Sequence, residues 1–180
     1  VPRKIKPRSI IATATKCEDL DEGIKVIGER INPTGKKKLK EALINNNMEY
    51  ILREAVTQKE KGADILDVNV GLPEINESEV ITGVVKEIQS IIDLPLQIDS
   101  SDAGAIEAAL RIYNGKAIIN SVNGKTEIMD TIFKIARKYG ACVVGLTLDE
   151  NGIPSSAEER FKIAEKIVNT AEKYGIPKEN

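Results

Sequence analysis

Histidine and tryptophan are absent from the 180 residues, and aromatic residues make up only 3% of the chain. Because histidine is the side chain that normally moves protons near neutral pH, acid–base chemistry in this chain must use carboxylates, amides or water. Catalytic triads built on histidine are therefore excluded within the chain. The shortage of aromatic side chains also argues against a stacking surface for single-stranded nucleic acid.

Cysteine is almost as scarce, since only Cys17 and Cys142 are present and they lie far apart without a CxxC pair. With no histidine to complete a usual zinc set, the sequence favours a reduced chain that binds no metal. Cys142 lies within an apolar run and is interpreted as a small core residue, because no neighbouring base would activate its thiol.

The chain also lacks a strong charge of either sign and lacks long apolar runs. The formal net charge is −2, so no general positive field attracts nucleic acid or anionic lipid. No apolar run approaches the roughly 20 residues of a membrane helix, and the basic start at residues 1–6 is not followed by a signal-peptide core. These absences predict a cytoplasmic protein whose partners are small molecules, with neither nucleic acid nor membrane among them.

Short β-branched runs alternate five times with amphipathic segments. Each run is typical of a parallel strand and each amphipathic segment of a crossover helix. Glycines at 62, 115 and 140 end helices just before the next strand, which is the order expected of an α/β fold. The predicted strands cover residues 25–32, 63–70, 94–100, 116–122 and 141–148, and the predicted helices cover 48–61, 78–92, 103–113, 126–139 and 157–174.

A (β/α)₈ barrel, the TIM barrel, is preferred to a doubly wound sheet because none of the first strands is followed by a nucleotide-binding glycine motif. A whole barrel needs about 250 residues, whereas residues 24–180 supply only the first five βα units. The chain ends after a helix stop at residues 174–177 that resembles the approach to a sixth strand, so we expect a truncated barrel. Residues 1–23 show no period and are predicted to be an interdomain linker from a preceding domain.

Polar side chains recur at the carboxyl ends of the five predicted strands, the rim where (β/α)₈ enzymes place their active sites. Some of them could simply cap the following helix, a role that suits Asp102 and Ser78 best. Asp67, Asp99 and Asn120 are more informative, because they lie inside β-branched runs rather than just before a helix. The rim residues are Glu29, Asn32, Asp67, Asn69, Asp99, Asn120, Asn123 and Asp149.

A rim of carboxylates and amides suits a flat heterocycle that hydrogen-bonds along its edges. One carboxylate accepts two adjacent N–H groups of an aminopyrimidinone, and asparagine serves mixed N–H and C=O edges. Pterins have such edges. Magnesium remains an alternative, since Asp and Asn oxygens also bind it, although the residues are spread over separate strands without a calcium-loop spacing.

Four segments resemble successive strand motifs of the pterin-binding superfamily. They are Val26-Ile-Gly-Glu-Arg-Ile-Asn-Pro-Thr-Gly35, Leu66-Asp-Val-Asn-Val-Gly71, Gln97-Ile-Asp-Ser-Ser101 and Ile119-Asn-Ser-Val-Asn-Gly124. Within that superfamily the chain is most similar to the methyltetrahydrofolate-binding domains of cobalamin-dependent methionine synthases. Its first residues are similar to the linker that follows their homocysteine-binding domain.

The resemblance implies a methyltransferase domain that takes part in methionine biosynthesis. It would bind 5-methyltetrahydrofolate as substrate and transfer the N5-methyl group to cob(I)alamin, which is carried on a separate domain or protein. It implies pterin contacts for Asp99 and Asn120, a first-strand polar contact for Glu29 and, with less support, contacts for Asn32, Asp67 and Asn69. No catalytic residue is assigned, and a fragment this short is expected to be inactive alone.

Dihydropteroate synthases and methyltetrahydrofolate:corrinoid protein methyltransferases are the alternatives within the same superfamily. Dihydropteroate synthases share the Asn32-Pro-Thr34 turn. After that turn the chain reads Gly-Lys-Lys-Lys38, and after Asp67 it reads Val-Asn-Val-Gly-Leu-Pro73. Both segments depart from the loops that serve pyrophosphate chemistry in dihydropteroate synthases. The run Lys36, Lys37 and Lys38 either meets the glutamate tail of a folate or another domain, or forms a solvated loop, which is the commoner role of such a run.

Overall fold

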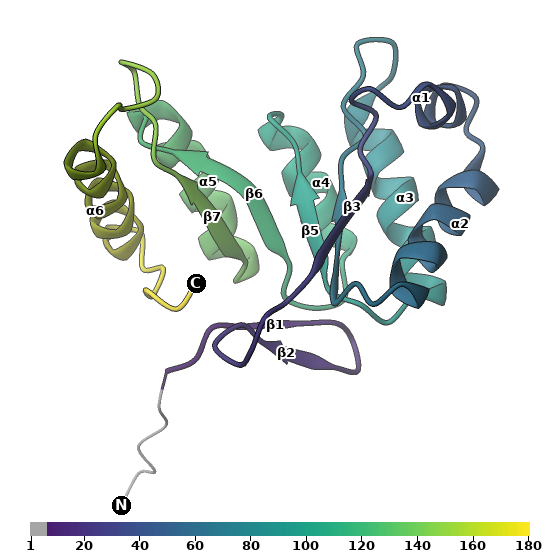
Figure 1. Ribbon diagram of the computed structural model, residues 1–180, viewed down its shortest axis with the longest axis horizontal. Helices are drawn as coiled ribbons and strands as arrows, with labels where there is room; N and C mark the ends of the chain where they lie inside the picture. The colour runs from purple at the N-terminus through teal and green to yellow at the C-terminus, as the bar shows by residue number, and fades with distance from the viewer. Residues whose placement is uncertain (1–6) are drawn as a thin grey trace, which may run out of the picture.

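The computed structural model describes residues 7–180. A β-hairpin comes first and is followed by five strands that alternate with helices (Figure 1). The strands are β1 Ile10–Ala12, β2 Cys17–Asp19, β3 Ile27–Ile31, β4 Ile65–Val68, β5 Leu96–Asp99, β6 Ile118–Asn123 and β7 Cys142–Leu146. The helices are α1 Lys37–Ile44, α2 Met48–Glu60, α3 Glu77–Ile91, α4 Ala103–Ile112, α5 Thr126–Tyr139 and α6 Ala157–Lys173.

Strands β3 to β7 form one parallel sheet in the order β3-β4-β5-β6-β7. Each of them lies within, or within one residue of, a run predicted from the sequence. The strand order follows the chain without the reversal that defines a doubly wound sheet. The predicted α/β fold, with the first five units of a (β/α)₈ barrel, is therefore confirmed.

The two faces of the sheet are covered differently. Alternate side chains such as Leu66, Val68 and Ile98 point outward and join the helices in one large core. The intervening side chains point inward, where Ile65, Ile118 and Cys142 form a second, smaller cluster with Ile11 of the hairpin. The helices thus cover the outer face, while the inner face is apolar only at its floor. Cys142 is a buried core residue, as predicted.

Hairpin β1–β2 closes the floor by lying under the amino ends of the strands (Figure 1). Ala12 and Lys116 exchange backbone hydrogen bonds of 3.0 and 2.9 Å, and the Tyr113 hydroxyl donates to the Ala12 carbonyl at 3.0 Å. Strands of three residues leave too short a pattern to find in the sequence. The described part of the predicted linker is therefore folded onto the sheet, residues 1–6 of that prediction lie outside the described residues, and the domain boundary at 23/24 stays a prediction.

Helix α1 was not predicted, and it corrects the interpretation of the lysine run as a loop. Lys37 and Lys38 lie in its first turn and are exposed, while Leu39 and Leu43 on the opposite face are buried. Eight residues with exposed lysines are too short to show a clear apolar period. Lys36 precedes the helix and turns back toward β3.

Side chains that accept a backbone N–H begin four of the helices. Asp102 caps α4, as predicted, by accepting from the Gly104 N–H at 2.7 Å. The prediction for Ser78 was wrong, because α3 begins at Glu77 and its cap is Asn76, two residues before Ser78. Within residues 7–180 no helix is both long enough and apolar enough to cross a membrane.

The close approach of the hairpin to Gly115 generates a stability prediction. A Cβ atom at Gly115 would lie 2.1 Å from the Ala12 carbonyl oxygen, so the backbone of the hairpin would have to move. We expect Gly115→Ala to lower the free energy of unfolding by about 1–3 kcal/mol, the usual cost of overpacking. Urea denaturation followed by circular dichroism measures this change.

Gly83→Ala is the matched control for that substitution. Gly83 lies within α3, and its Cβ atom would meet nothing nearer than the Met48 methyl group at 4.0 Å. This substitution is expected to stabilise the chain by up to about 1 kcal/mol through helix propensity. If both substitutions changed the free energy of unfolding equally, the hairpin would not pack closely against Gly115.

Candidate functional site

A polar cavity of about 390 Å³ lies inside the sheet at the carboxyl ends of β3 to β6. Four adjacent strands supply its lining, and Asn32, which directly follows β3, completes it. The lining residues are Ile27, Glu29, Asn32, Asp67, Gln97, Asp99 and Asn120. Three carboxylates and three amides therefore face one cavity that has a single apolar wall residue.

The alternation of side chains along each strand produces this composition. Asp67 lies two residues after Ile65, and Asn120 two residues after Ile118, so each pair points to the inner face. The register places Asp67 opposite Gln97, and Asp99 opposite Asn120. Strands β4 and β6 are thus apolar at the floor and polar at the mouth, and the polar groups of β4, β5 and β6 lie side by side.

Asp67 is the most deeply buried charged group of the site, with only 1% of its surface exposed. The Gln97 side-chain amide donates to its Oδ1 at 2.6 Å. Its other oxygen, Oδ2, is buried without a hydrogen-bond partner among residues 7–180. A buried carboxylate oxygen without a donor is costly, so Asp67, which lines the cavity, carries an acceptor that the described part of the protein leaves unsatisfied.

Burial raises the pKa of Asp67 to about 6, since a carboxylate away from water disfavours its charge. The negative charges of Asp99 and Glu29 raise this pKa further, while the amides of Gln97 and Asn120 lower it. Asp67 therefore changes protonation state near neutral pH. In a chain without histidine, that makes it a group suited to pH-dependent chemistry.

Asp99 is oriented by a neighbour that does not itself line the cavity. The Asn69 side chain donates from Nδ2 to Asp99 Oδ2 at 3.0 Å, and its Oδ1 accepts the Gly71 N–H at 2.9 Å. Both ends of the Asn69 amide are thus engaged within the protein. Asn69 positions Asp99 and leaves the other Asp99 oxygen to face the cavity.

Glu29 and Asn32 form the β3 side of the mouth. Lys36 donates to the Glu29 carboxylate at 3.2 Å and to its backbone carbonyl at 3.1 Å. The Asn32 side chain accepts the Thr34 N–H at 3.0 Å, which leaves its NH₂ group as a donor. Lys36 is thus tied to the rim, and of the lysine run it is the one that lies beside the site.

The structure places most of the predicted site residues around this one cavity, and their role in binding a pterin stays a prediction. Of its six residues, Glu29, Asn32, Asp67, Asp99 and Asn120 line the cavity. The sixth, Asn69, lies behind Asp99. Gln97 was missed as a site residue, although its position two residues before Asp99 in the same strand signals that it faces inward.

Two further rim residues lie apart from this cavity. Asn123 lines a neighbouring cavity of about 280 Å³ outside the rim, which shares Asp99 and Asn120 with the first. Asp149 lies in the loop between β7 and α6 and faces a separate surface hollow. Across the described part of the chain, no three Cys, Asp or Glu side chains gather in a way that could hold a metal ion.

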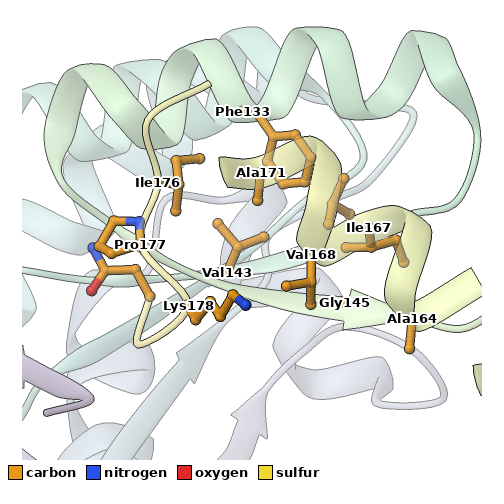
Figure 2. A pocket seen from close by; sticks show the side chains of 12 residues that line it. Phe133, Val143, Gly145, Ala164, Ile167, Val168, Ala171, Ile176, Pro177 and Lys178 are labelled. Atoms are coloured by element: carbon orange, nitrogen blue, oxygen red, sulfur yellow. The ribbon is translucent and has the colours of Figure 1, made fainter. Parts of the chain in front are cut away.

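An apolar cavity of about 250 Å³ lies on the opposite, outer face of the sheet (Figure 2). Phe133, Val143 and Ile167 line it together with Ile176 and Pro177 of the C-terminal segment. Its polar side chains are limited to Lys178 and Asn180 at the end of the chain. It offers little to orient a polar ligand, and the inner cavity remains the candidate site.

The chain matches the family described as pterin binding enzyme over residues 28–180. It is 30% identical to the methionine synthase of Mycobacterium tuberculosis over 154 residues and to that of Mycobacterium leprae over 159 residues. These matches cover 83% and 85% of this chain but only 13% of either relative. The chain thus spans a small part of the curated relatives that it matches.

Solved dihydropteroate synthases share the fold. The enzyme from Vibrio fischeri aligns with a TM-score of 0.68 at 17% identity, covering 94% of this chain and 63% of that chain. The enzyme from Thermus thermophilus aligns with a TM-score of 0.64 at 21% identity, covering 93% of this chain and 62% of that one. At these identities the likeness establishes the fold of a pterin-binding barrel, of which this chain has the first five units.

The raised pKa of Asp67 predicts how stability depends on pH. The folded chain holds a proton on Asp67 up to about pH 6, whereas the unfolded chain loses it near the ordinary value of 3.8. The folded state therefore loses stability as pH rises through this window. Asp67→Asn, which keeps the acceptor for Gln97, should raise the free energy of unfolding by about 1–3 kcal/mol at pH 8 and leave it nearly unchanged at pH 4.

Urea denaturation at both pH values measures the difference, with Glu87→Gln on the exposed side of α3 as the control for removing one charge. The control should behave like the wild type at both pH values. An Asp67→Asn chain that is less stable than the wild type at pH 8 would contradict the assignment of Asp67 as an uncompensated buried carboxylate.

Proposed function

This chain belongs to the pterin-binding enzyme family, and from that premise we propose that its polar cavity binds 5-methyltetrahydrofolate for methyl transfer. In this proposal the bound folate presents its N5-methyl group to cob(I)alamin carried on a separate domain. Cob(I)alamin supplies the nucleophile that takes the methyl group. The chain is then the folate-binding part of a methyltransferase of the methionine synthase type.

The cavity lined by carboxylates and amides from four neighbouring strands is the observation that carries the proposal. The pyrimidinone edge of a reduced pterin offers several N–H donors beside one carbonyl acceptor. Asp67 and Asp99 present acceptors that only N–H or O–H groups can satisfy, while Asn120 and Asn32 serve mixed edges. A ring of this kind would satisfy the buried Oδ2 of Asp67 that the protein leaves unpaired.

The negative charge of the cavity favours a ligand that places no phosphate group inside it. Glu29, Asp67 and Asp99 face the same space, and Lys36 already pairs with Glu29. A phosphate group placed among these carboxylates would be repelled. The carboxylates attract a neutral ring that carries several N–H donors. Every pterin has such a ring, whatever group is attached to it.

The proposed methyl transfer also requires the site to stabilise a change of charge on N5 of the folate. When the methyl carbon leaves N5, the electron pair of the broken bond remains on N5, which must gain a proton or a strong hydrogen bond. Fixed polar groups that line the cavity meet that demand better than freely moving solvent does. No residue of this chain is assigned as the proton donor.

The methionine synthase relatives support the further partners in this proposal. Because the chain spans only 13% of their length, we propose that a homocysteine-binding domain precedes it and that a cobalamin-binding domain or protein receives the methyl group. The proposed location is cytoplasmic.

Two other activities of the family are the alternatives. A methyltetrahydrofolate:corrinoid protein methyltransferase would use the same cavity and differ only in the methyl acceptor. A dihydropteroate synthase is favoured by the solved structures of that name, which align with TM-scores of 0.61 to 0.68. Against it, the chain enters α1 and its exposed lysines two residues after Gly35, rather than a loop of the synthase type.

Two assays separate these activities. Methyl transfer from 5-methyltetrahydrofolate to cob(I)alamin, in the full-length protein, is expected to produce tetrahydrofolate. Condensation of a hydroxymethylpterin pyrophosphate with p-aminobenzoate is expected to produce nothing. The opposite pair of results would assign the chain to the dihydropteroate synthases.

Substitution of Asp99 tests where the ring binds. Asp99→Asn keeps the shape but replaces an acceptor with an amide whose NH₂ group would face the donors of the ring. We expect it to weaken 5-methyltetrahydrofolate binding by about 2–3 kcal/mol, or roughly 30- to 150-fold. Asn120→Ala should cost about 1–2 kcal/mol, because water partly replaces a neutral amide. Isothermal titration calorimetry measures both.

Asp149→Asn is the matched control, since Asp149 lies beyond the carboxyl end of β7 but faces a different hollow. It should leave the affinity within twofold of the wild type, or about 0.4 kcal/mol. If folded Asp99→Asn bound the folate as tightly as this control, the rim of β5 and β6 would not be the pterin site.

A further inference from the structure

Gln97 divides the inner face of the sheet into two spaces. It lines the polar cavity at the mouth and also a larger space of about 420 Å³ above the hairpin, which Ile65, Ile118 and Cys142 line as well. Only 6% of its surface is exposed. A long polar side chain in the middle of a four-residue strand is unfavourable there unless its amide is hydrogen-bonded.

The amide finds that partner in Asp67. The register sets Gln97 directly opposite Asp67 on β4, and the bond from Nε2 to Oδ1 is 2.6 Å long. The two oxygens of Asp67 are thereby made unequal, because Oδ1 is held by the protein and Oδ2 is left without a partner in the part of the chain that the structure describes. Rotation of the carboxylate would break the bond to Gln97.

We propose that Gln97 is a positioning residue that holds Asp67 so that only Oδ2 accepts an N–H of the bound ring, and that it thereby sets the pH range in which the cavity binds a pterin. The inference rests on the proposed function for the ligand, but its first half concerns the protein alone. Gln97 itself need not touch the reacting atoms.

Because negative charges surround Asp67, the hydrogen bond from Gln97 strongly affects the pH at which Asp67 is protonated. Asp99 from β5 and Glu29 from β3 face it as negative charges and favour its protonation, as does burial. Lys36 is engaged by Glu29 rather than by Asp67. Within the described residues, the amides of Gln97 and Asn120 are the groups that oppose protonation of Asp67, and they lower its pKa. Loss of the Gln97 amide should therefore protonate Asp67 at a higher pH.

Gln97→Met and Gln97→Leu test the inference by removing the amide while keeping an apolar side chain of similar size. In the protein without ligand, carbon-13 NMR of the Asp67 carboxyl group should show its titration midpoint rise by about one pH unit in both variants, the effect of one lost hydrogen bond. Gln89→Met is the matched control. Both ends of the Gln89 amide are also hydrogen-bonded, to the Ile112 carbonyl and the Asn114 N–H, but Gln89 lies on α3 and does not line the cavity.

Affinity for 5-methyltetrahydrofolate, measured from pH 5.5 to 8.5, supplies the second readout. The Gln97 variants should bind about fivefold more weakly than the wild type at pH 6 and within twofold of it at pH 8.5, where Asp67 is ionised in all of them. The control should follow the wild type at every pH. A merely structural role would instead weaken binding equally across the range.

Unchanged titration midpoints in both Gln97 variants would overturn the inference, and so would a loss of affinity that is the same at every pH. Failure of the proposed function looks different. In that case the wild type would bind no folate at any pH, although the Asp67 midpoint still moved when the Gln97 amide was removed.

Discussion

The lateral register of the parallel sheet is the constraint on which the rest of the structure depends. Pairing Asp67 with Gln97, and Asp99 with Asn120, brings together polar groups that lie about 20 to 30 residues apart in the chain. A slip of one residue would turn these side chains into the apolar layer under the helices. The apolar side chains that alternate with them, such as Val68 and Ile98, are fully buried in that layer. Packing of the outer core therefore holds the inner site in register.

The inner face of the sheet contains an unfavourable interaction that the outer face lacks, the repulsion between carboxylates. Its floor is apolar, with Ile65 and Ile118 packed under the hairpin, and its mouth collects three carboxylates within one cavity. Amides reduce the resulting repulsion, since Gln97 bonds Asp67 and Asn69 bonds Asp99. The unpaired Oδ2 of Asp67 remains as a local cost, as is common where a protein is built to bind something.

Much of this arrangement could be predicted from the sequence because β-branched runs and amphipathic helices have different periods. The five strands and five of the helices follow from that alternation, and the inward direction of Asp67, Asp99 and Asn120 follows from their place within strands. The hairpin was missed because strands of three residues show no period, and α1 because its lysines resemble a solvated loop. The sequence could not reveal that the Asn69 amide is bonded to Asp99 and Gly71, and a contact of Asn69 with the pterin stays a prediction. Gln97 was overlooked because its partner is fixed only by the register between strands.

We propose that a pterin binds in the cavity lined by Glu29 and Asn120, rather than in the apolar cavity beside α6. A crystal structure of the protein with 5-methyltetrahydrofolate tests this most directly. We expect the pyrimidinone edge of the ring to lie within hydrogen-bonding distance of Asp99, Asn120 and the Oδ2 atom of Asp67, with Asn69 still bonded to Asp99. A ring bound in the cavity lined by Phe133 and Ile167, or an Asp67 Oδ2 that remains unpaired beside the bound ring, would contradict it.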